Sequence, residues 1–302
     1  MIGSIHALEW LGSSGNVAAG FDGLEGFMDL EAEYNNRARV PEHLDIIAGW
    51  QSDAAAYRDA AQCELDLAYG ATERTKLDLF HADGEDPPMA MFIHGGYWQA
   101  MDRKVFSHMA HGLNAHGISV AMPSYDLCPA VTIGDIVEQM RQCCAWLWSQ
   151  YRKPLTVFGH SAGGHLTAAM MATDWPARDG ALPASFVPAG YAISGVFDLV
   201  PLIETSLNAA LGLDEETAHS LSPLYWQPPA DSHIVAAVGA LESGEFLRQS
   251  QTVCDAWSAH GVLTTYREIE NTNHFTVISG LADAASPMVH DIVELTQSSA
   301  RS

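Results

Sequence analysis

The sequence predicts an α/β protein with a mostly parallel, twisted sheet and helices on both faces. From Met89 onward, short apolar runs typical of buried strands alternate with longer segments whose apolar residues recur at helical spacing. Such alternation requires crossover connections between parallel strands. One junction is the hexapeptide Gly159-His-Ser-Ala-Gly-Gly164, which places a serine in a tight turn between a strand and a helix.

Eight strand segments and several helices can be placed from their patterns. The expected strands cover residues 63–69, 75–80, 89–93, 117–122, 154–158, 186–194, 232–238 and 263–269. The first two alternate with period two across a turn, which predicts an antiparallel hairpin at one edge of the sheet. Helices are expected over residues 132–150, 165–172 and 285–296. No repeat or further boundary interrupts residues 62–302, so we expect one domain there.

Residues 1–61 are expected to form an N-terminal extension and helical appendage. Residues 1–22 are rich in Gly, Ser and Ala with little periodicity, whereas residues 24–61 follow a helical pattern that breaks at Pro41. Helices in this position must pack against the domain. They could cover its functional edge as a lid, or they could pack beside the core.

The composition indicates which classes of partner to expect. The chain has 37 acidic and 14 basic residues, a formal net charge of −23, and a pI of about 4.7. Such a surface repels phosphate backbones and anionic lipids, so we expect no nucleic-acid or membrane partner, whereas a homo-oligomer stays open. The five cysteines lack metal-ligand spacing, and the N-terminus lacks the features of a signal peptide. We therefore expect a cytoplasmic protein that needs no metal and no cofactor.

The serine motif has the spacing that a nucleophile needs. Gly159 and Gly163 avoid Cβ clashes in a strained turn, and the turn pushes the Ser161 hydroxyl out of the sheet. The amides that open the next helix point at negative charge developing there. This nucleophile elbow is typical of α/β-hydrolases. The alternative is a chance match in Gly- and Ala-rich sequence, against which the strand–turn–helix context argues.

A serine nucleophile needs a base, which on this fold follows the last strand. His274 is the only histidine in that loop, so we expect it to be the general base. The alternative is a surface histidine in a chain that has 14 of them. His160, beside the serine, is expected to point its side chain elsewhere.

The base needs an acid to orient it, and Glu242 stands where the strand over residues 232–238 should present a side chain. Glu245, one helical turn later, is the second candidate, and Asp198 after the preceding strand is the third. Either glutamate could instead serve the helix N-terminus, where acids interact favourably with the helix dipole.

An oxyanion hole is expected after the strand over residues 89–93, in the sequence His94-Gly-Gly-Tyr-Trp98. Two glycines let the backbone approach a substrate closely, so the amides of Gly96 and Tyr97 should act together with that of Ala162. His94 should fix the loop by a hydrogen bond rather than move protons. The alternative is an ordinary Gly-Gly turn.

Together, these two motifs resemble the α/β-hydrolase branch that contains arylformamidases (kynurenine formamidases) and their carboxylesterase relatives. The likeness extends from Tyr69 to Phe275 and includes Ile193-Ser-Gly-Val-Phe-Asp198 and residues 242–249. Residues 33–41 also look like the N-terminal stretch of bacterial members. The resemblance implies an acid at Glu242, where the family usually has Asp.

We therefore expect a metal-independent serine hydrolase that cleaves a small carboxylic ester or activated amide through an acyl-enzyme. Tyr97, Trp98 and Phe197 are expected to line an acyl or aryl pocket, unless they pack in the core. An N-formylkynurenine formamidase is an alternative within this class, favoured by the His-Gly-Gly-Tyr-Trp motif. A non-catalytic binding protein on a hydrolase fold is the alternative from another class, although intact Ser, His and acid positions argue against it.

Overall fold

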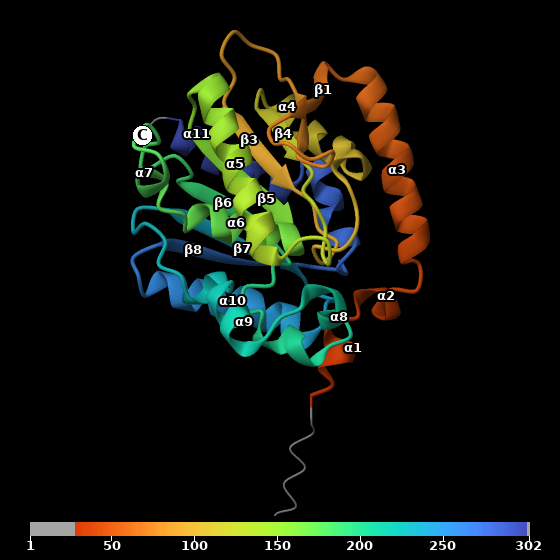
Figure 1. Ribbon diagram of the computed structural model, residues 1–302. Coiled ribbons are helices and arrows are strands. Elements are labelled where there is room, and N and C mark those ends of the chain that lie inside the picture. The colour runs from red at the N-terminus through yellow and green to blue at the C-terminus, as the bar shows by residue number, and fades with distance from the viewer. Residues whose placement is uncertain (1–27, 301–302) are drawn as a thin grey trace, which may run out of the picture.

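An eight-stranded sheet runs through the computed structural model, which describes residues 28–300 (Figure 1). The strand order is β1-β2-β4-β3-β5-β6-β7-β8. Strand β2 pairs antiparallel with both β1 and β4, and the remaining neighbours are parallel. The strands are β1 (Cys63–Ala68), β2 (Lys76–Phe80), β3 (Met89–Ile93), β4 (Ser119–Pro123), β5 (Leu155–His160), β6 (Ala189–Ile193), β7 (His233–Gly239) and β8 (Leu263–Ile269). The predicted fold class and the predicted edge hairpin are confirmed.

Helices accompany this sheet along the chain. They are α1 (Leu30–Tyr34), α2 (Asn36–Arg39), α3 (His43–Ala60), α4 (His111–Ala115), α5 (Ile133–Tyr151), α6 (Ala162–Met171), α7 (Trp175–Arg178), α8 (Asn208–Leu211), α9 (Glu215–Ser220), α10 (Gly244–Ser258) and α11 (Pro287–Ser299). Helix α6 begins earlier than its pattern predicts, because the turn at Ser161 leads directly into it. Among residues 28–300, no helix is long and apolar enough to cross a membrane.

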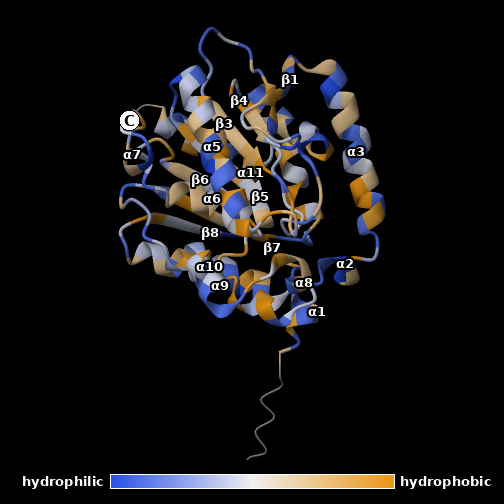
Figure 2. Cartoon of the chain, viewed as in Figure 1, coloured by the Kyte–Doolittle hydropathy of each residue, from blue (hydrophilic) through white to orange (hydrophobic). Residues whose placement is uncertain are grey.

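The two faces of the sheet bury separate apolar cores. Along β3, Met91 and Ile93 belong to the core that also contains residues of α5, α6 and α10. Phe92, which alternates with them, belongs to the core that contains residues of α3, α4 and α11. Strands buried on both faces read as continuous apolar runs. Figure 2 accordingly shows hydrophobic colours along the central strands and hydrophilic colours in the loop between β2 and β3.

The described part of the N-terminal segment packs against the rest of the described fold. The helical pattern breaks at Pro41, as its sequence predicts, and separates α2 from α3. Trp50 of α3 lies with its ring centroid 5.4 Å from that of Phe106. Tyr34 of α1 is 1% exposed and its ring meets that of Phe246 on α10 edge-on. The extension expected over residues 1–22 lies outside the described residues.

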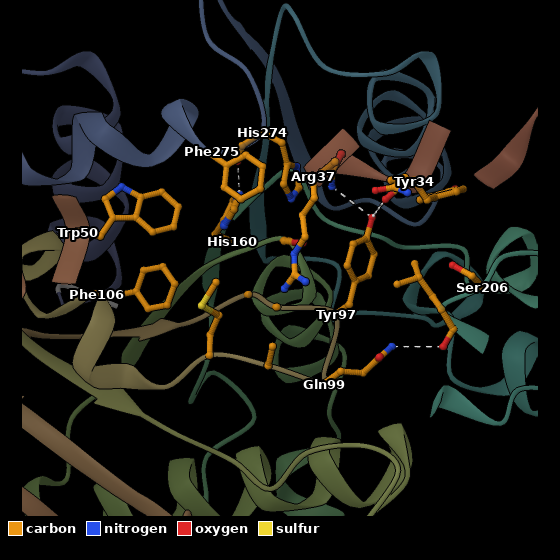
Figure 3. A pocket seen from close by; sticks show the side chains of 18 of the residues that line it. Tyr34, Arg37, Trp50, Tyr97, Gln99, Phe106, His160, Ser206, His274 and Phe275 are labelled. Carbon is orange, nitrogen blue, oxygen red and sulfur yellow. Dashed lines mark hydrogen bonds between the residues drawn. The ribbon is translucent and has the colours of Figure 1, made fainter. Parts of the chain in front are cut away.

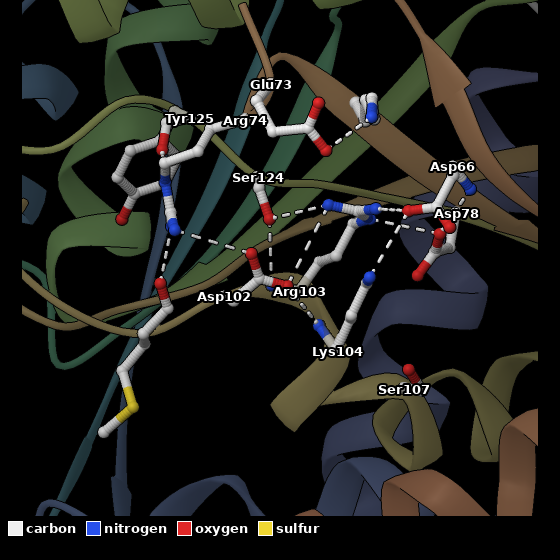
Figure 4. A network of polar contacts seen from close by, with 12 residues as sticks. Asp66, Glu73, Arg74, Asp78, Asp102, Arg103, Lys104, Ser107, Ser124 and Tyr125 are labelled. Carbon is white, nitrogen blue, oxygen red and sulfur yellow. Dashed lines mark hydrogen bonds and ion pairs between the residues drawn. The ribbon is translucent and has the colours of Figure 1, made fainter.

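Buried charges join α3 to the edge hairpin and to the segment that follows β3. Figure 4 shows the part of this network around Arg103, Asp66 and Asp78. Asp78 on β2 is fully buried and pairs with both Arg58 of α3 and Arg103, whose Nε lies 3.1 Å from Asp78 Oδ1. Arg103, 2% exposed, also pairs with Asp66, and its amide donates to Ser124 Oγ at 3.0 Å. Asp78 thus pairs with two guanidinium groups, and one of them, that of Arg103, is also paired with the half-exposed Asp66.

Replacing Asp78 should destabilise the fold strongly, because a buried pair that loses one member leaves an uncompensated charge. For Asp78→Asn we expect a loss of about 3–5 kcal/mol in the free energy of unfolding, measured by urea denaturation. Asp291→Asn is the matched control, since it breaks an ion pair with the half-exposed Arg267 and should cost at most about 1 kcal/mol. Equal losses in the two variants would contradict this account of the network.

Candidate active site

The turn at Ser161 joins β5 to α6 in a conformation that a non-glycine residue rarely adopts. Its φ is 57° and its ψ is −118°. A Cβ added to Gly163 would lie 1.9 Å from the carbonyl oxygen of Ile93, and one added to Gly159 would lie 2.3 Å from that of Gly163. Side chains at either glycine would therefore force β5, α6 and the end of β3 apart. Strain of this kind persists only where the surrounding structure enforces it.

His274 follows β8 and contacts a carboxylate presented after β7. Its Nδ1 lies 2.6 Å from Oε2 of Glu242, whose side chain is fully buried. The other carboxylate oxygen of Glu242 accepts hydrogen bonds from the Gly239 amide at 2.8 Å and from Ser194 Oγ at 2.5 Å. A buried carboxylate needs such donors to offset its lost hydration. Hydrogen bonding at Nδ1 leaves Nε2 of His274 free to accept a proton.

The two other acid candidates have different partners. Glu245 accepts hydrogen bonds from Tyr34 Oη at 2.7 Å and from Arg248 Nε at 2.6 Å. Burial opposes ionisation of Glu245, but the bonds from Arg248 and Tyr34 outweigh it and lower its pKa. Asp198 accepts from the Val200 amide at 3.1 Å. Glu245 therefore ties α1 to α10, a role for which its sequence context gives no local signal.

His160 lies inside the site, contrary to its expected orientation. It lines the same cavity as Ser161 and His274. Its Nε2 lies 2.8 Å from the carbonyl oxygen of His274, so the ring carries its proton on that nitrogen and donates it. Complete burial holds the pKa of His160 well below its usual value. The residue is therefore neutral and fixes the backbone that carries His274.

The loop after β3 lies directly against the turn at Ser161. A Cβ on Gly95 would come within 2.8 Å of the His160 carbonyl oxygen and 2.9 Å of Ser161 Cβ. Gly96 and Tyr97 have φ values of +114° and 49°. Ala162 opens α6, and the first amides of a helix have no intrahelical partner.

His94 and Tyr97 anchor this loop from both ends. His94 is fully buried, stacks on Tyr125 at 4.3 Å, and has its Nδ1 2.7 Å from the Gly95 carbonyl oxygen. Burial lowers its pKa to about 4, so it is neutral at physiological pH. Tyr97 Oη donates to the Tyr34 carbonyl oxygen at 2.7 Å and accepts from Asn36 Nδ2 at 3.2 Å. The loop is thereby bonded to α1 and α2.

A cavity of about 360 Å³ opens in front of these groups (Figure 3). Ser161, His160, His274, Gly95, Gly96 and Tyr97 line it on the side of the sheet. Trp50, Phe106 and Phe275 form an aromatic wall, and Tyr34, Asn36 and Arg37 contribute from α1 and α2. Within residues 28–300, no group of three His, Cys, Asp or Glu side chains could hold a metal ion.

Two of the expected pocket residues do not line this cavity. Trp98 and Phe197 are fully buried in the core, whereas Tyr97 does line the cavity. The Trp98 ring meets that of His165 edge-on at 5.1 Å, and the Phe197 ring lies against the backbone of Gly195. In an irregular turn, neighbouring side chains point in unrelated directions, so adjacency to the motif does not predict which of them face the substrate. The sequence does not predict that Trp50, Phe106 and Arg37 line the cavity, because tertiary packing brings them there.

Comparison with known proteins gives concordant results. Residues 90–278 match the α/β-hydrolase fold family. Kynurenine formamidase of Salmo salar is 33% identical over 75% of this chain and 79% of its own, and that of Danio rerio is 29% identical over 84% and 91%. A crystal structure from Silicibacter sp. TM1040, provisionally assigned as a thioesterase, is 34% identical and superposes with a TM-score of 0.81 over 88% of this chain and 99% of its own. The chain therefore belongs to the α/β-hydrolase fold family, on the branch of the kynurenine formamidases, and is a hydrolase of esters or amides.

Proposed function

We propose that the protein is a serine hydrolase of small carboxylic esters or activated amides in which Ser161, His274 and Glu242 form the catalytic triad. The observation that carries this proposal is the 2.6 Å contact between His274 Nδ1 and the buried Glu242 carboxylate, beside the cavity that Ser161 also lines. A hydrogen-bonded pair of a buried carboxylate and a histidine beside a cavity is typical of active sites.

In the proposed reaction, Ser161 Oγ attacks the substrate carbonyl while His274 takes its proton at Nε2. Glu242 holds the imidazole in the required tautomer and stabilises its charged form. The amides of Gly96, Tyr97 and Ala162 stabilise the oxyanion. His274 then returns the proton to the leaving group, and a water molecule attacks the acyl-enzyme with the same residue as base.

We propose further that residues 1–61 form the appendage of a hydrolase domain over residues 62–302, and that their helices cover the site. Residues of α1, α2 and α3 line the cavity, and Tyr34 is bonded to the loop after β3, which support this role. The expected partner is a small-molecule substrate. The five free cysteines fit the expected cytoplasmic location.

Removing the proposed nucleophile should abolish turnover and leave the fold intact, because the Ser161 hydroxyl faces a cavity and not the packed core. We expect Ser161→Ala to lower kcat for 4-nitrophenyl acetate by about 10⁴-fold or more. A fluorophosphonate probe should label the wild-type protein but not the variant, at unchanged thermal stability. Near-wild-type turnover in the folded variant would refute the proposal, and a wild type that is neither active nor labelled would favour a binding protein.

The acid can be assigned by comparing two glutamates. Glu242→Gln should lower kcat by about two to four orders of magnitude, the scale expected when the imidazole loses its orienting carboxylate. Glu245→Gln is the matched control. It disturbs the bonds to Tyr34 and Arg248, so it should lower stability while kcat falls at most about tenfold. A larger loss of kcat in Glu245→Gln than in Glu242→Gln would show that the acid is misassigned.

N-formylkynurenine is a second candidate substrate class, favoured by relatives that are kynurenine formamidases and by the His94-Gly-Gly-Tyr-Trp98 motif. If the formamide is the preferred substrate, kcat/KM for N-formyl-L-kynurenine should exceed that for 4-nitrophenyl acetate at least about tenfold, although the ester is chemically more reactive. Both activities should disappear in Ser161→Ala. A preference for the ester would be compatible with the proposed serine hydrolase but would contradict the formamidase alternative.

A further inference from the structure

Arg37 differs from the other described arginines and lysines in having no partner among residues 28–300. Between residues 28 and 300, every other arginine and lysine forms an ion pair with a carboxylate, except Arg152, whose guanidinium lies over the Trp148 ring. Arg37 has neither kind of contact in this part of the chain. Because acidic residues outnumber basic ones 37 to 14, an arginine without a carboxylate is unusual here.

Arg37 lines the proposed catalytic cavity, so an arginine without a carboxylate partner stands where a substrate would bind. Figure 3 shows its side chain extending from α2 into the cavity, between His160 and Tyr97. Helix α2 is held in place by the bond from Asn36 to Tyr97 Oη. The backbone that carries Arg37 is therefore held in place, and its guanidinium lies at the wall of the cavity opposite the sheet.

The acidic residue of the same cavity does not neutralise it. Glu31 accepts hydrogen bonds from the amide and the hydroxyl of Ser206 at 2.8 and 2.9 Å, and from Asn35 Nδ2 at 3.3 Å. No oxygen of Glu31 lies within ion-pair distance of Arg37. The guanidinium thus keeps its donors available to a molecule that enters the cavity.

We propose that Arg37 binds a carboxylate of the substrate, so that the hydrolysed ester or amide belongs to a small molecule that also carries a free carboxylic acid. This inference rests on the proposed function of the cavity. A guanidinium matches a carboxylate through two parallel hydrogen bonds, which fixes orientation as well as position. A protein with a net charge of −23 repels anions at long range, so an anionic substrate requires a local cation such as this one.

The test uses pairs of substrates that differ in one charge, with the full-length protein and three variants. On the acyl side, mono-(4-nitrophenyl) succinate is compared with 4-nitrophenyl butyrate. On the leaving-group side, N-formyl-L-kynurenine is compared with its primary amide. The variants are Arg37→Gln, Arg37→Lys and, as a control, Arg39→Gln. Arg39 lies on the same helix and pairs with Glu33 at 3.8 Å, but it is not among the residues that line the cavity.

We expect the wild type to prefer the member with the free carboxylate in at least one pair. For that substrate, Arg37→Gln should lower kcat/KM about 10- to 100-fold through KM, the scale of a charge-assisted hydrogen bond. The member of the pair that lacks the carboxylate should change less than about twofold. Arg37→Lys should recover part of the preference, and Arg39→Gln should keep it. As the KCl concentration rises, KM for the carboxylate-bearing member should increase in the wild type relative to Arg37→Gln.

The inference is overturned if the wild type prefers the carboxylate-bearing member in neither pair, or if Arg37→Gln and Arg39→Gln have equal effects, which would indicate net charge alone. Failure of the proposed function has a different signature, since the wild type would then turn over no member of either pair. In that case, calorimetric titration of L-kynurenine and its primary amide still decides whether Arg37 binds a carboxylate. Selective loss of L-kynurenine binding in Arg37→Gln would support the inference, and equal binding would refute it.

Discussion

The close approach of α6 to the end of β3 is the constraint on which the geometry of the site depends. The backbone of Gly163 leaves no room for a Cβ against the Ile93 carbonyl oxygen. Because helix and strand come this close, the chain must turn sharply at Ser161, and the loop that begins at His94 must pass beside that turn. Gly95 then fits against Ser161 for the same reason. Two glycine positions thus determine both where a nucleophile can stand and where the amides facing it can lie.

The topology of the sheet brings the remaining groups to this point. Ser194, Gly239 and His274 all contact Glu242. Gly239 is the last residue of β7, Ser194 and His274 follow β6 and β8, and these three strands are neighbours in parallel register. Residues far apart in the sequence therefore converge at one edge, as is usual for open parallel sheets. The hydrogen bonds to Glu242 compensate its burial and hold it against His274, so stability and orientation have the same structural origin.

Much of this arrangement can be predicted from the sequence, because strand and helix periodicity are local properties. Strand ends then indicate where residues such as Glu242 and His274 stand. The prediction is less successful where tertiary packing decides which way a side chain points or what it contacts. Trp98 turns into the core although it belongs to the loop motif, and Arg37 reaches the cavity from a helix whose position depends on Asn36 and Tyr97. The hydrogen bond from Ser194 to Glu242 cannot be predicted from local sequence either, because the two residues lie on different strand ends and neither local pattern depends on the other.

The cavity is built by two stretches of the chain, of which one lies within the match to the α/β-hydrolase family and the other precedes it. The residues proposed for the chemistry lie between positions 90 and 278, the part that matches the α/β-hydrolase family, whereas Tyr34, Arg37 and Trp50 precede it. The proposed reacting groups and the wall that faces them therefore lie on separate stretches of the chain. Substitutions in α1, α2 or α3 would change which molecules the cavity admits without moving those groups. Substrate range can thus evolve through the N-terminal helices while the residues proposed for the chemistry stay in place.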